Sequence, residues 1–288
     1  MSSVPETVVM VEPKDFRVRP HASVTQAVRG QDGDFKLTCE FIDFSWGDFG
    51  TTRTFYHPYP PFSRLFVQQT GEVLVDVSGE RFSLTPGRMY FLPAGQAFEA
   101  TYREGTRIKG FHLHLCDGVG FPLADHFRGV PVLDDAALFA SIVAAVETGD
   151  AALIQAAVFP ALLCFCRPFF PLLSRRANPA ALLRRVLDAV ATTPPGELRV
   201  GELARALRVT RAALSKSFQR QFGVSLKRHV ANAAIEMAKG LLLETELTVK
   251  ELSGRLGYAE ASYFHSFFRR RLGVTPAEYR RRYRGGGF

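Results

Sequence analysis

The sequence predicts an α+β chain of two parts: an N-terminal antiparallel β-barrel with following helices, and a C-terminal all-α domain of two helix-turn-helix units. Three observations lead to this prediction. The chain has 288 residues, a length that suggests about two domains. Short strand-like runs between turns fill residues 35–115, and residues 178–288 contain an internal repeat with helical spacing.

Charge is divided unevenly between the two parts. Residues 1–177 contain 16 Lys+Arg against 19 Asp+Glu, a net charge of −3, whereas residues 178–288 contain 20 against 9, a net charge of +11. The excess positive charge of the chain, +8 in total, therefore coincides with the repeat. This is expected for a domain whose partner carries phosphates.

Several classes of protein do not fit the sequence. No two cysteines form a C-x-x-C pair, so small buried hydrophobic residues are a better interpretation than a zinc site. Acidic residues interrupt the N-terminal segment, so no signal peptide is expected. Three prolines and an arginine interrupt the longest apolar stretch, residues 151–173, so we expect no membrane span and a cytoplasmic protein. The cysteines are Cys39, Cys116, Cys164 and Cys166.

The N-terminal half is predicted to be an arm followed by a barrel. Residues 1–34 are polar and broken by proline and glycine, which indicates an extended arm. In residues 35–130 the pattern changes to short strands; Val73, Val75 and Val77, for example, alternate with other residues before a turn. Many short strands at this spacing are typical of an antiparallel barrel or jelly roll.

Residues 131–175 change to a helical pattern rich in alanine and leucine. Helices are predicted over residues 136–146 and 151–165, with Gly149 and Asp150 between them. Their apolar side chains need cover. Packing on the barrel would give it, and so would an interface between two copies of the chain; we expect a homodimer.

The C-terminal domain, residues 176–288, begins with a predicted helix over 180–191 and then repeats itself. The offset between the copies is 49 residues before a short turn and 50 after it. Each copy reads as a short helix, a tight turn and a second helix whose apolar positions recur every four residues, which is the layout of a helix-turn-helix unit at about 198–223 and 248–273. The paired positions are Leu203 and Leu252, Leu207 and Leu256, Leu214 and Phe264, Phe218 and Phe268, Phe222 and Leu272, and Gly223 and Gly273.

The second helix of each unit has a polar face opposite the apolar stripe. Thr210 is predicted to cap the first of these helices. A helix predicted over 226–243, about 27 Å long, joins the units and could hold the two polar faces about 34 Å apart, one turn of DNA. The runs 269–271 and 280–282 are arginines suited to phosphate contacts. The residues predicted on the polar faces are Ala212, Ser215, Lys216 and Gln219, and Ser262, Tyr263, His265, Ser266 and Arg269.

Residues 180–284 resemble the AraC/XylS family of bacterial transcription regulators. The second unit carries the resemblance best, in Leu256-Gly-Tyr, Ser262-Tyr-Phe, Phe267-Phe-Arg and Gly273-Val-Thr-Pro-Ala-Glu-Tyr-Arg. The resemblance implies binding to promoter DNA and recruitment or obstruction of RNA polymerase. By matching position, it also implies base contacts from Ala212, Ser215, Lys216, Ser262, Tyr263, His265 and Ser266. Ala259 departs from the family, since a capping Ser or Asp is expected there.

These residues have alternative interpretations. Lys216 and the arginine runs contact phosphate rather than bases in one interpretation. In the alternative interpretation of His265, it is a solvated surface histidine. In the alternative interpretation of Tyr263, its ring packs sideways along the helix.

Thr85-Pro-Gly-Arg-Met-Tyr-Phe-Leu-Pro-Ala-Gly-Gln-Ala-Phe98 resembles the second conserved motif of cupin barrels. Phe98 stands where metal-binding cupins have a histidine. A metal-dependent enzyme is therefore not expected, and we expect no cofactor. What the resemblance implies instead is a barrel that senses a small-molecule effector, with a sugar as one candidate.

Six residues of the N-terminal half are candidates for contacting that effector. His112 and His114 lie on one face of a strand and Phe111, Leu113 and Leu115 on the other; the pair faces either solvent or the barrel interior. The other four candidates are Trp46, His57, Arg64 and Arg88.

The sequence thus predicts a DNA-binding transcription regulator, most simply an effector-responsive activator that places two recognition helices in successive major grooves. Two alternatives remain. One is an enzyme, either a metal cupin or a DNA-repair methyltransferase, against which stand Phe98 and the lack of a cysteine in a Pro-Cys-His setting. The other is an architectural DNA binder that needs no effector.

Overall fold

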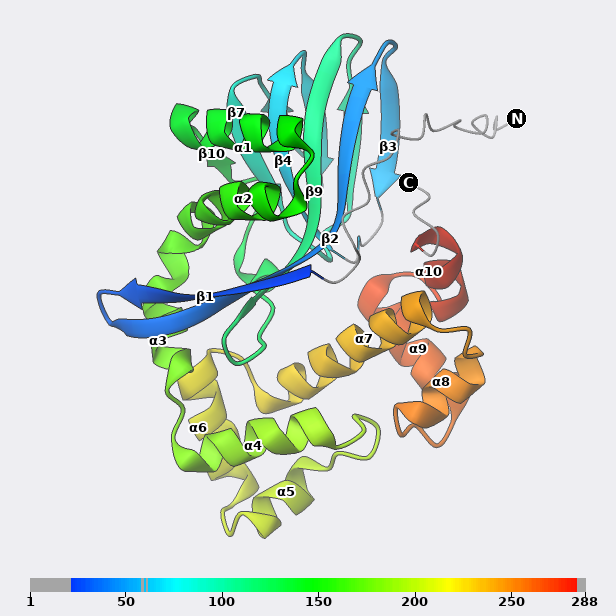
Figure 1. Cartoon of the computed structure of the whole chain (residues 1–288). Helices are drawn as coiled ribbons and strands as arrows, with labels where there is room; N and C mark the ends of the chain where they lie inside the picture. The colour runs from blue at the N-terminus through cyan, green and yellow to red at the C-terminus, as the bar shows by residue number, and fades with distance from the viewer. Residues whose placement is uncertain (1–21, 58–59, 61, 284–288) are drawn as a thin grey trace.

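The computed structural model describes residues 22–57, 60 and 62–283, and it confirms the predicted fold class (Figure 1). The N-terminal part consists of two antiparallel sheets. The six-stranded sheet has the order β1-β2-β9-β4-β7-β10 and the four-stranded sheet the order β3-β8-β5-β6. The strands are β1 (Ala22–Gly30), β2 (Gly33–Phe49), β3 (Arg53–His57), β4 (Ser63–Thr70), β5 (Val73–Val77), β6 (Glu80–Leu84), β7 (Arg88–Leu92), β8 (Phe98–Tyr102), β9 (Thr106–Asp117) and β10 (Val132–Leu133).

Alternate residues of the larger sheet face two different cores. In β9, Ile108 points toward the four-stranded sheet and packs with Phe66, Val75 and other residues of a core between the sheets. Phe111 of the same strand belongs to a second core on the opposite face. This period of two is what a strand covered on both faces requires.

The first strand lies within the segment predicted as an arm. Residues 1–21 of that segment lie outside the described residues. Residues 22–30 form β1, which pairs with β2 from Ala22 opposite Phe41 to Gly30 opposite Gly33. Val24 and Val28 alternate toward the core, so the chain gains apolar packing by pairing instead of extending into solvent.

Two helices cover the outer face of the larger sheet, close to the predicted positions. α1 (Ala136–Thr148) and α2 (Ala151–Cys166) begin at Asp135 and Asp150, whose carboxylates each accept two backbone N–H bonds. The run Ala151–Ala177 is long and apolar enough to cross a membrane by length and composition. Its α2 part packs into the core of the larger sheet, and core packing accounts for the same composition.

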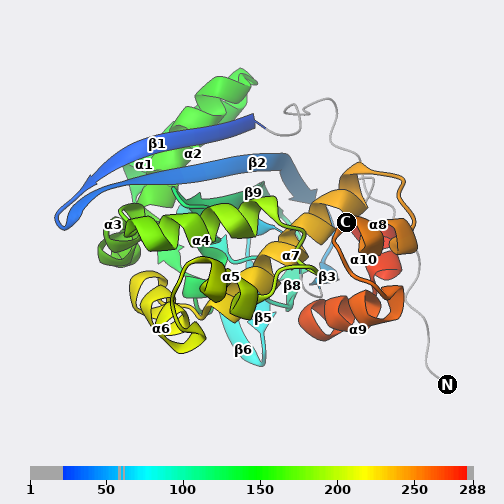
Figure 2. The same ribbon diagram turned by 90° about the horizontal axis from the view of Figure 1, so that it is seen from below.

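The remaining helices form the C-terminal half, seen from below in Figure 2. Two short 3₁₀ turns, η1 (Ala124–His126) and η2 (Arg167–Phe169), precede them. The predictions over 180–191 and 226–243 are confirmed within one residue by α4 and α7. The helices are α3 (Phe170–Ala177), α4 (Ala181–Thr192), α5 (Val200–Ala206), α6 (Arg211–Phe222), α7 (Leu226–Glu244), α8 (Val249–Arg255), α9 (Ala261–Leu272) and α10 (Pro276–Tyr283).

Candidate nucleic-acid interface

The predicted repeat is a structural repeat. α5 and α6 form the first helix-turn-helix unit, α8 and α9 the second, and α7 passes between them (Figure 1). The predicted stripes are buried in both copies. Leu214, Phe218 and Phe222 enter one core, and Phe264, Phe268 and Leu272 enter another.

The turns of the two units reach the same conformation with different residues. Gly257 has a φ of +78°, and its counterpart 49 residues earlier, Arg208, has a φ of +57°. A side chain in this left-handed region costs about 1 kcal/mol or more. The second recognition helix ends at Gly273 and the first at Gly223, both left-handed as predicted.

The starts of the two recognition helices differ. Thr210 caps α6 as predicted, because its hydroxyl accepts a bond from the backbone N–H of Ala213 at 3.1 Å. The cap position of α9 is Glu260, not Ala259 as expected from the family pattern, and Glu260 makes no side-chain capping bond. The expectation was off by one residue because the extra residue lies in the turn before this position.

The predicted polar faces stand away from both cores. Tyr263 has 60% of its surface exposed, whereas Ser215 and His265 are half-buried. The outward positions match across the repeat at an offset of 50: 212 with 262, 215 with 265, 216 with 266, and 219 with 269. The exposed members of the set are Ala212, Lys216, Gln219, Ser262, Tyr263, Ser266 and Arg269.

Two arginines of the runs predicted for phosphate contacts make hydrogen bonds within the chain. Arg280 donates from Nε to the Leu242 carbonyl at 3.0 Å, so it closes the C-terminal end of α7. Arg271 donates to the Asn232 side chain at 3.2 Å. Arg269 and Arg270 remain exposed on α9. Sequence alone does not distinguish these arginines, because each lies within a run of three.

The loop between α4 and α5, just before the first unit, touches the turn of the second unit. The N–H of Gly196, in the loop between α4 and α5, donates to the Leu256 carbonyl at 2.8 Å. A Cβ on Gly196 would lie 2.7 Å from the backbone nitrogen of Tyr258 and still closer to the carbonyl of Gly257. Only glycine fits there. The separation of the units is therefore set by this contact as well as by α7, which at 19 residues is about 28 Å long.

The structure gathers three of the six predicted effector residues. Arg64 on β4 pairs in register with His112 on β9, and the guanidinium lies 5.2 Å from the ring of Phe98, against which the His57 ring packs at 4.6 Å. Burial, and then the charge of Arg64, lower the pKa of His57 to about 3 and the pKa of His112 well below its ordinary value.

The other three candidates lie apart. Trp46 is half-buried under the Nζ of Lys109, 4.8 Å from its ring. Arg88 is exposed and forms an ion pair with Asp134 at 2.9 Å. His114 is half-buried, and like His112 it projects from the face of β9 that carries Ile108. The sequence left undecided whether His112 and His114 face solvent or the interior. Their side of β9 therefore faces the interior of the sandwich and not solvent.

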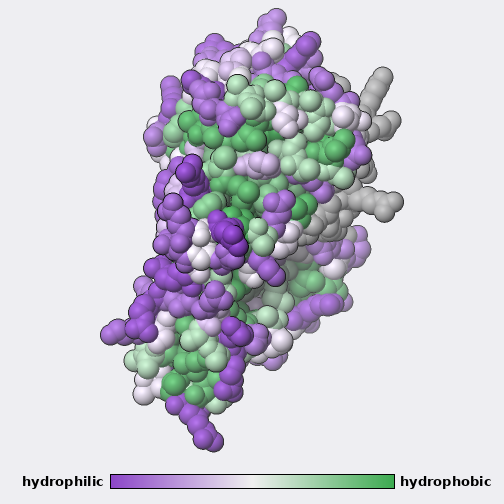
Figure 3. All heavy atoms as spheres, turned by 60° about the vertical axis from the view of Figure 1, so that its left-hand side comes forward, coloured by the Kyte–Doolittle hydropathy of each residue, from purple (hydrophilic) through white to green (hydrophobic). Residues whose placement is uncertain are grey.

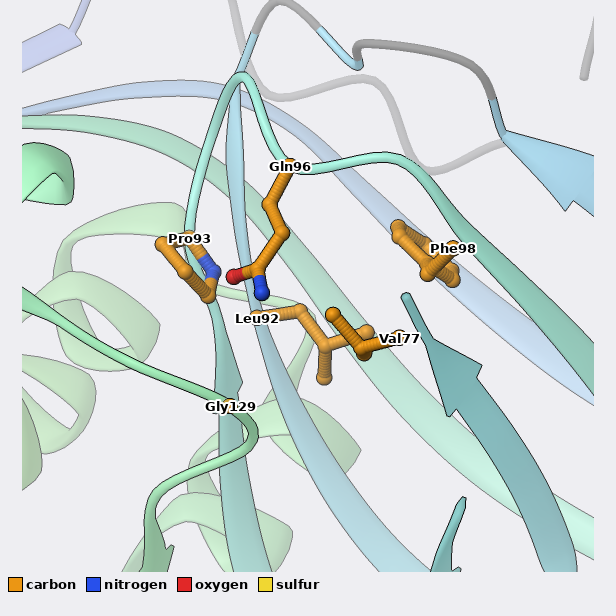
Figure 4. Close-up of a pocket in the computed structure, with 6 residues that line it drawn as sticks. All are labelled: Val77, Leu92, Pro93, Gln96, Phe98 and Gly129. Atoms are coloured by element: carbon orange, nitrogen blue, oxygen red, sulfur yellow. The ribbon is translucent and has the colours of Figure 1, made fainter. Parts of the chain in front are cut away.

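Among the described residues, the space between the sheets has no cavity at the cupin-like motif. Figure 4 shows Gln96 turned back over Leu92 and Pro93, with Val77 and Phe98 beside them. These side chains and Gly129 close over one another and leave no volume for a ligand. Phe98, at the place of the metal histidine in cupins, is 3% exposed and belongs to the core between the sheets.

A larger cleft of about 680 Å³ separates the sheets from the C-terminal half. One wall is formed by the middle of β2, by the end of β9, including His114, and by the loop after β9; the other is formed by α7 and the end of α9. Its charged side chains are of both signs. Asp125 pairs with Arg228 at 3.2 Å, and Glu236 with Lys239 at 2.7 Å.

A buried ion pair, which the sequence did not indicate, joins the two halves. Asp117 at the end of β9 and Arg176 on α3 are 3.0 Å apart, and their side chains are 2% and 1% exposed. Burial raises the pKa of the Asp117 carboxyl, although two backbone N–H bonds and Arg176 oppose that shift. No sequence signal marks this pair, because Arg176 follows another arginine and lies 59 residues from its partner.

Comparisons with known proteins bear on the C-terminal half. Residues 203–282 match the model of a family described as a helix-turn-helix domain. The xylose operon regulatory protein of Escherichia coli (strain K12) is 31% identical over 83 residues, which are 29% of this chain and 21% of that protein. The transcriptional activator RhaR of Enterobacter sp. (strain 638) is 30% identical over 104 residues, 36% of this chain and 37% of that protein. The matches thus span less than half of these relatives.

Solved structures are similar over the same half or more. The C-terminal domain of AraT, a response regulator from Geobacillus stearothermophilus, is 29% identical, with 36% of this chain and 88% of that chain covered and a TM-score of 0.35. Unsaturated fatty acid-bound ToxT from Vibrio cholerae is 15% identical, with 83% and 94% covered and a TM-score of 0.49.

Proposed function

Because residues 203–282 are a helix-turn-helix domain of the AraC type, we propose that the whole chain is an effector-responsive transcription regulator, and an activator. α6 and α9 read two successive major grooves of promoter DNA. The outcome at the promoter is recruitment of RNA polymerase. The protein acts in the cytoplasm.

One observation carries this proposal: the outward positions of α6 and α9 correspond one to one. A surface used twice on one duplex needs two helices with equivalent faces and a fixed separation. α7 and the contact between Gly196 and Gly257 supply the separation. The net charge of +11 over residues 178–288 supplies the attraction to phosphates.

The roles of the face residues follow from their length and chemistry. Ser215, Ser262, His265 and Ser266 are short or planar hydrogen-bonding groups that reach base edges, and Ala212 and Tyr263 offer apolar contact to thymine methyl groups. Gln219 is long enough for either bases or phosphate. Lys216 and Arg269 contact phosphate or guanine, since both cations suit either.

A selection experiment tests the DNA proposal. Duplexes enriched from a random pool by the full chain should bind with an affinity that falls steeply as salt rises. Lys216→Ala should lower the affinity and reduce the slope of log K against log salt by about 1. Lys36→Ala, an exposed lysine on β2, is the matched control and should change neither. If Ser262→Ala combined with His265→Ala leaves sequence preference unchanged, the reading face is wrongly assigned.

We place the effector in the cleft between the sheets and α7. The cleft is bounded by both halves of the chain, so an occupant has different contacts when the halves move apart, as a switching ligand requires. Glu40, His114, Asn232 and Glu236 line it and suit the hydroxyl groups of a small polar molecule such as a sugar. Trp46 and Arg88 do not line it.

Thermal-shift screening of the full chain with sugars and small aromatic acids tests this placement. A binding compound should raise the melting temperature of the full chain, and Asn232→Leu should abolish the shift. A set of compounds that gives no shift, combined with sequence-specific DNA binding, would favour the architectural binder that needs no effector.

We further propose that the chain forms a homodimer through α1 and α2. Figure 3, which brings this side of the molecule forward, shows apolar surface over its upper part. Leu153 on α2 is 51% exposed and Val132 beside α1 is 55% exposed. Light scattering after size exclusion should give twice the chain mass of 32.0 kDa, and Leu153→Glu should restore the single mass. Met237→Glu, at a site 43% exposed on α7, should not.

A further inference from the structure

The two sides of the loop between β9 and β10 face different parts of the molecule. On one side Gly120, Pro122, Ala124 and Asp125 line the cleft, directly after Cys116 at the end of β9. On the other side the loop leaves the sheets and enters the C-terminal half. One short segment therefore forms both a wall of the proposed effector site and part of the first helix-turn-helix unit.

Phe121 is the residue of this loop that enters the first unit. It is 4% exposed and belongs to the core that contains Leu214, Phe218 and Phe222. Its ring stacks on Phe222 at 5.0 Å and on His229 at 4.2 Å. A side chain from the N-terminal half thus completes the core behind the first recognition helix.

Asp117 and Arg176 fix the same loop to the end of that helix. The Oδ1 atom of Asp117 accepts N–H bonds from Val119 at 3.1 Å and Phe121 at 2.9 Å, which shapes the loop. Arg176 donates from Nη1 to the Oδ2 atom of Asp117 at 3.0 Å, and from Nε and Nη2 to the carbonyl of Phe222 at 2.9 and 2.6 Å. Phe222 is the last residue of α6.

In the part of the chain that the structure describes, the core of the second unit contains no ring of the N-terminal half. His229 and Tyr279 are counterparts at an offset of 50, and each packs on the matching phenylalanine, Phe218 at 5.5 Å and Phe268 at 5.5 Å. The core around Tyr279 contains residues from 235 to 279. Only the first copy therefore stacks a ring of the N-terminal half.

We propose that the loop of residues 117–127 couples occupancy of the cleft to the first recognition helix, with Asp117 and Arg176 as positioning residues that hold α6 in register with the sheets. This rests on the proposed function. An occupant that shifts the cleft side of the loop moves Phe121 and Asp117 together, since both are fixed to it, and the end of α6 follows. The loop also reaches α9, through solvent-exposed side-chain bonds from Asn232 to Asp125 and from Arg271 to Asn232, each 3.2 Å long. These bonds are weaker than the buried contacts to α6, so α6 moves more than α9 and the effector changes the relation between the two reading faces.

Amide hydrogen exchange of the full chain tests the connection without DNA or effector. Arg176→Gln and, separately, Phe121→Ala should raise exchange at residues 219–222 at least tenfold. Residues 269–272, the matched end of α9, should stay within twofold of the wild type. Arg88→Gln, which breaks an exposed ion pair, is the control and should change neither segment. Equal changes at both segments, or none, would overturn the proposal.

If the single variants unfold, the double variant Asp117→Leu with Arg176→Met keeps the test open. Replacement of both members of a buried ion pair by apolar residues often preserves stability, whereas removal of one leaves a buried charge. The double variant has no donor for the Phe222 carbonyl. It should therefore show the same selective rise in exchange at residues 219–222.

A cleft-filling variant tests the coupling itself. A Cβ at Gly240, which lines the cleft from α7, would meet only the side chain of Glu244, at 3.7 Å. Gly240→Phe should alter exchange at residues 117–127 and 219–222 at least threefold relative to Gly240→Ala. Combined with Arg176→Gln, it should alter residues 219–222 no further. An unchanged loop and α6 in the filled cleft would refute the coupling.

DNA binding separates this proposal from the proposed function. On duplexes selected by the wild type, Arg176→Gln should reduce base discrimination at least tenfold in the half-site that responds to Lys216→Ala. Discrimination in the half-site that responds to Ser266→Ala should persist. A uniform loss in both half-sites would overturn the positioning role. Failure to select any duplex would refute the proposed function, while the exchange results would still decide the connection between loop and α6.

Discussion

The contact between the α4–α5 loop and the turn of the second unit gives a prediction whose size follows from the structure. In Gly196→Ala the new methyl group would lie 2.7 Å from the nitrogen of Tyr258 and closer to the carbonyl of Gly257. Carbon atoms prefer separations of about 3.5–4.0 Å, so the loop and the turn must separate by about 1 Å. Both obstacles are backbone atoms, which a rotamer change cannot remove.

Two costs arise from this separation. Overpacking of this kind typically destabilises by about 1–3 kcal/mol. The hydrogen bond from Gly196 to the Leu256 carbonyl, 2.8 Å long, contributes about 1 kcal/mol when it is lost. We therefore expect Gly196→Ala to lower the free energy of unfolding by about 2–4 kcal/mol.

Urea denaturation of the full chain, monitored by circular dichroism, measures this loss in the free energy of unfolding. Gly254→Ala is the matched control, because a Cβ at this site in α8 has no neighbour within 4 Å; it should stabilise by about 0.5–1 kcal/mol. Affinity for a duplex with both half-sites should also fall more in Gly196→Ala than affinity for a single half-site. A stability change equal to that of Gly254→Ala would show that the contact between the loop and the turn does not hold the units together.

Three further predictions follow from single residues. Glu260→Asp keeps the negative charge at the start of α9 and adds a capping acceptor like the one that Thr210 gives α6. It should stabilise the chain by about 1 kcal/mol, which calorimetry would record as a rise in melting temperature of about 2–4 °C. An unchanged melting temperature would contradict the cap assignment. Burial, then the charge of Arg176, lowers the pKa of His229 to about 4. As the pH falls, the unfolded chain therefore protonates this histidine before the folded chain does. The stability that is present above pH 6.5 is lost as the pH falls toward 4. His229→Phe should reduce the loss between pH 7 and 5 by about 2 kcal/mol in urea titrations; parallel profiles for the two proteins would refute this. Phe218→Ala should destabilise by about 3–5 kcal/mol, as measured by urea midpoints, and a loss below 1 kcal/mol would show that its core collapses into the space.

Much of the C-terminal half could be predicted because its information is local and repeated. The stripe of Leu214, Phe218 and Phe222 has helical spacing, and Gly223 marks the helix end; both are properties of a few consecutive residues. Because the pattern occurs twice, each copy of the repeat supported the assignment of the other. The bounds of the two units and their polar faces followed from this. The proposed base contacts and the predicted domain limits at residues 34, 130 and 175 stay predictions.

The contacts between the halves could not be predicted, since they join residues far apart in the sequence. Asp117 and Arg176 form their pair across 59 positions, and neither stands out from its neighbours. The sequence did not decide which way His112 faces, for a related reason. Both faces of β9 are buried, so hydrophobic alternation does not identify the face that points to the interior of the sandwich. The role of Arg280 differs from that of other arginines only through the carbonyl of Leu242 that it meets in the folded chain.

The insertion of Phe121 has a consequence for work on fragments of this chain. A cut near residue 177, between α3 and α4, would remove Phe121 and with it one wall of a hydrophobic core. The released fragment would keep an intact second unit, while its first unit would expose the rings of Phe222 and His229 to water. Truncated forms should therefore bind one of the two proposed half-sites well and the other poorly, and their affinity would underestimate that of the complete chain.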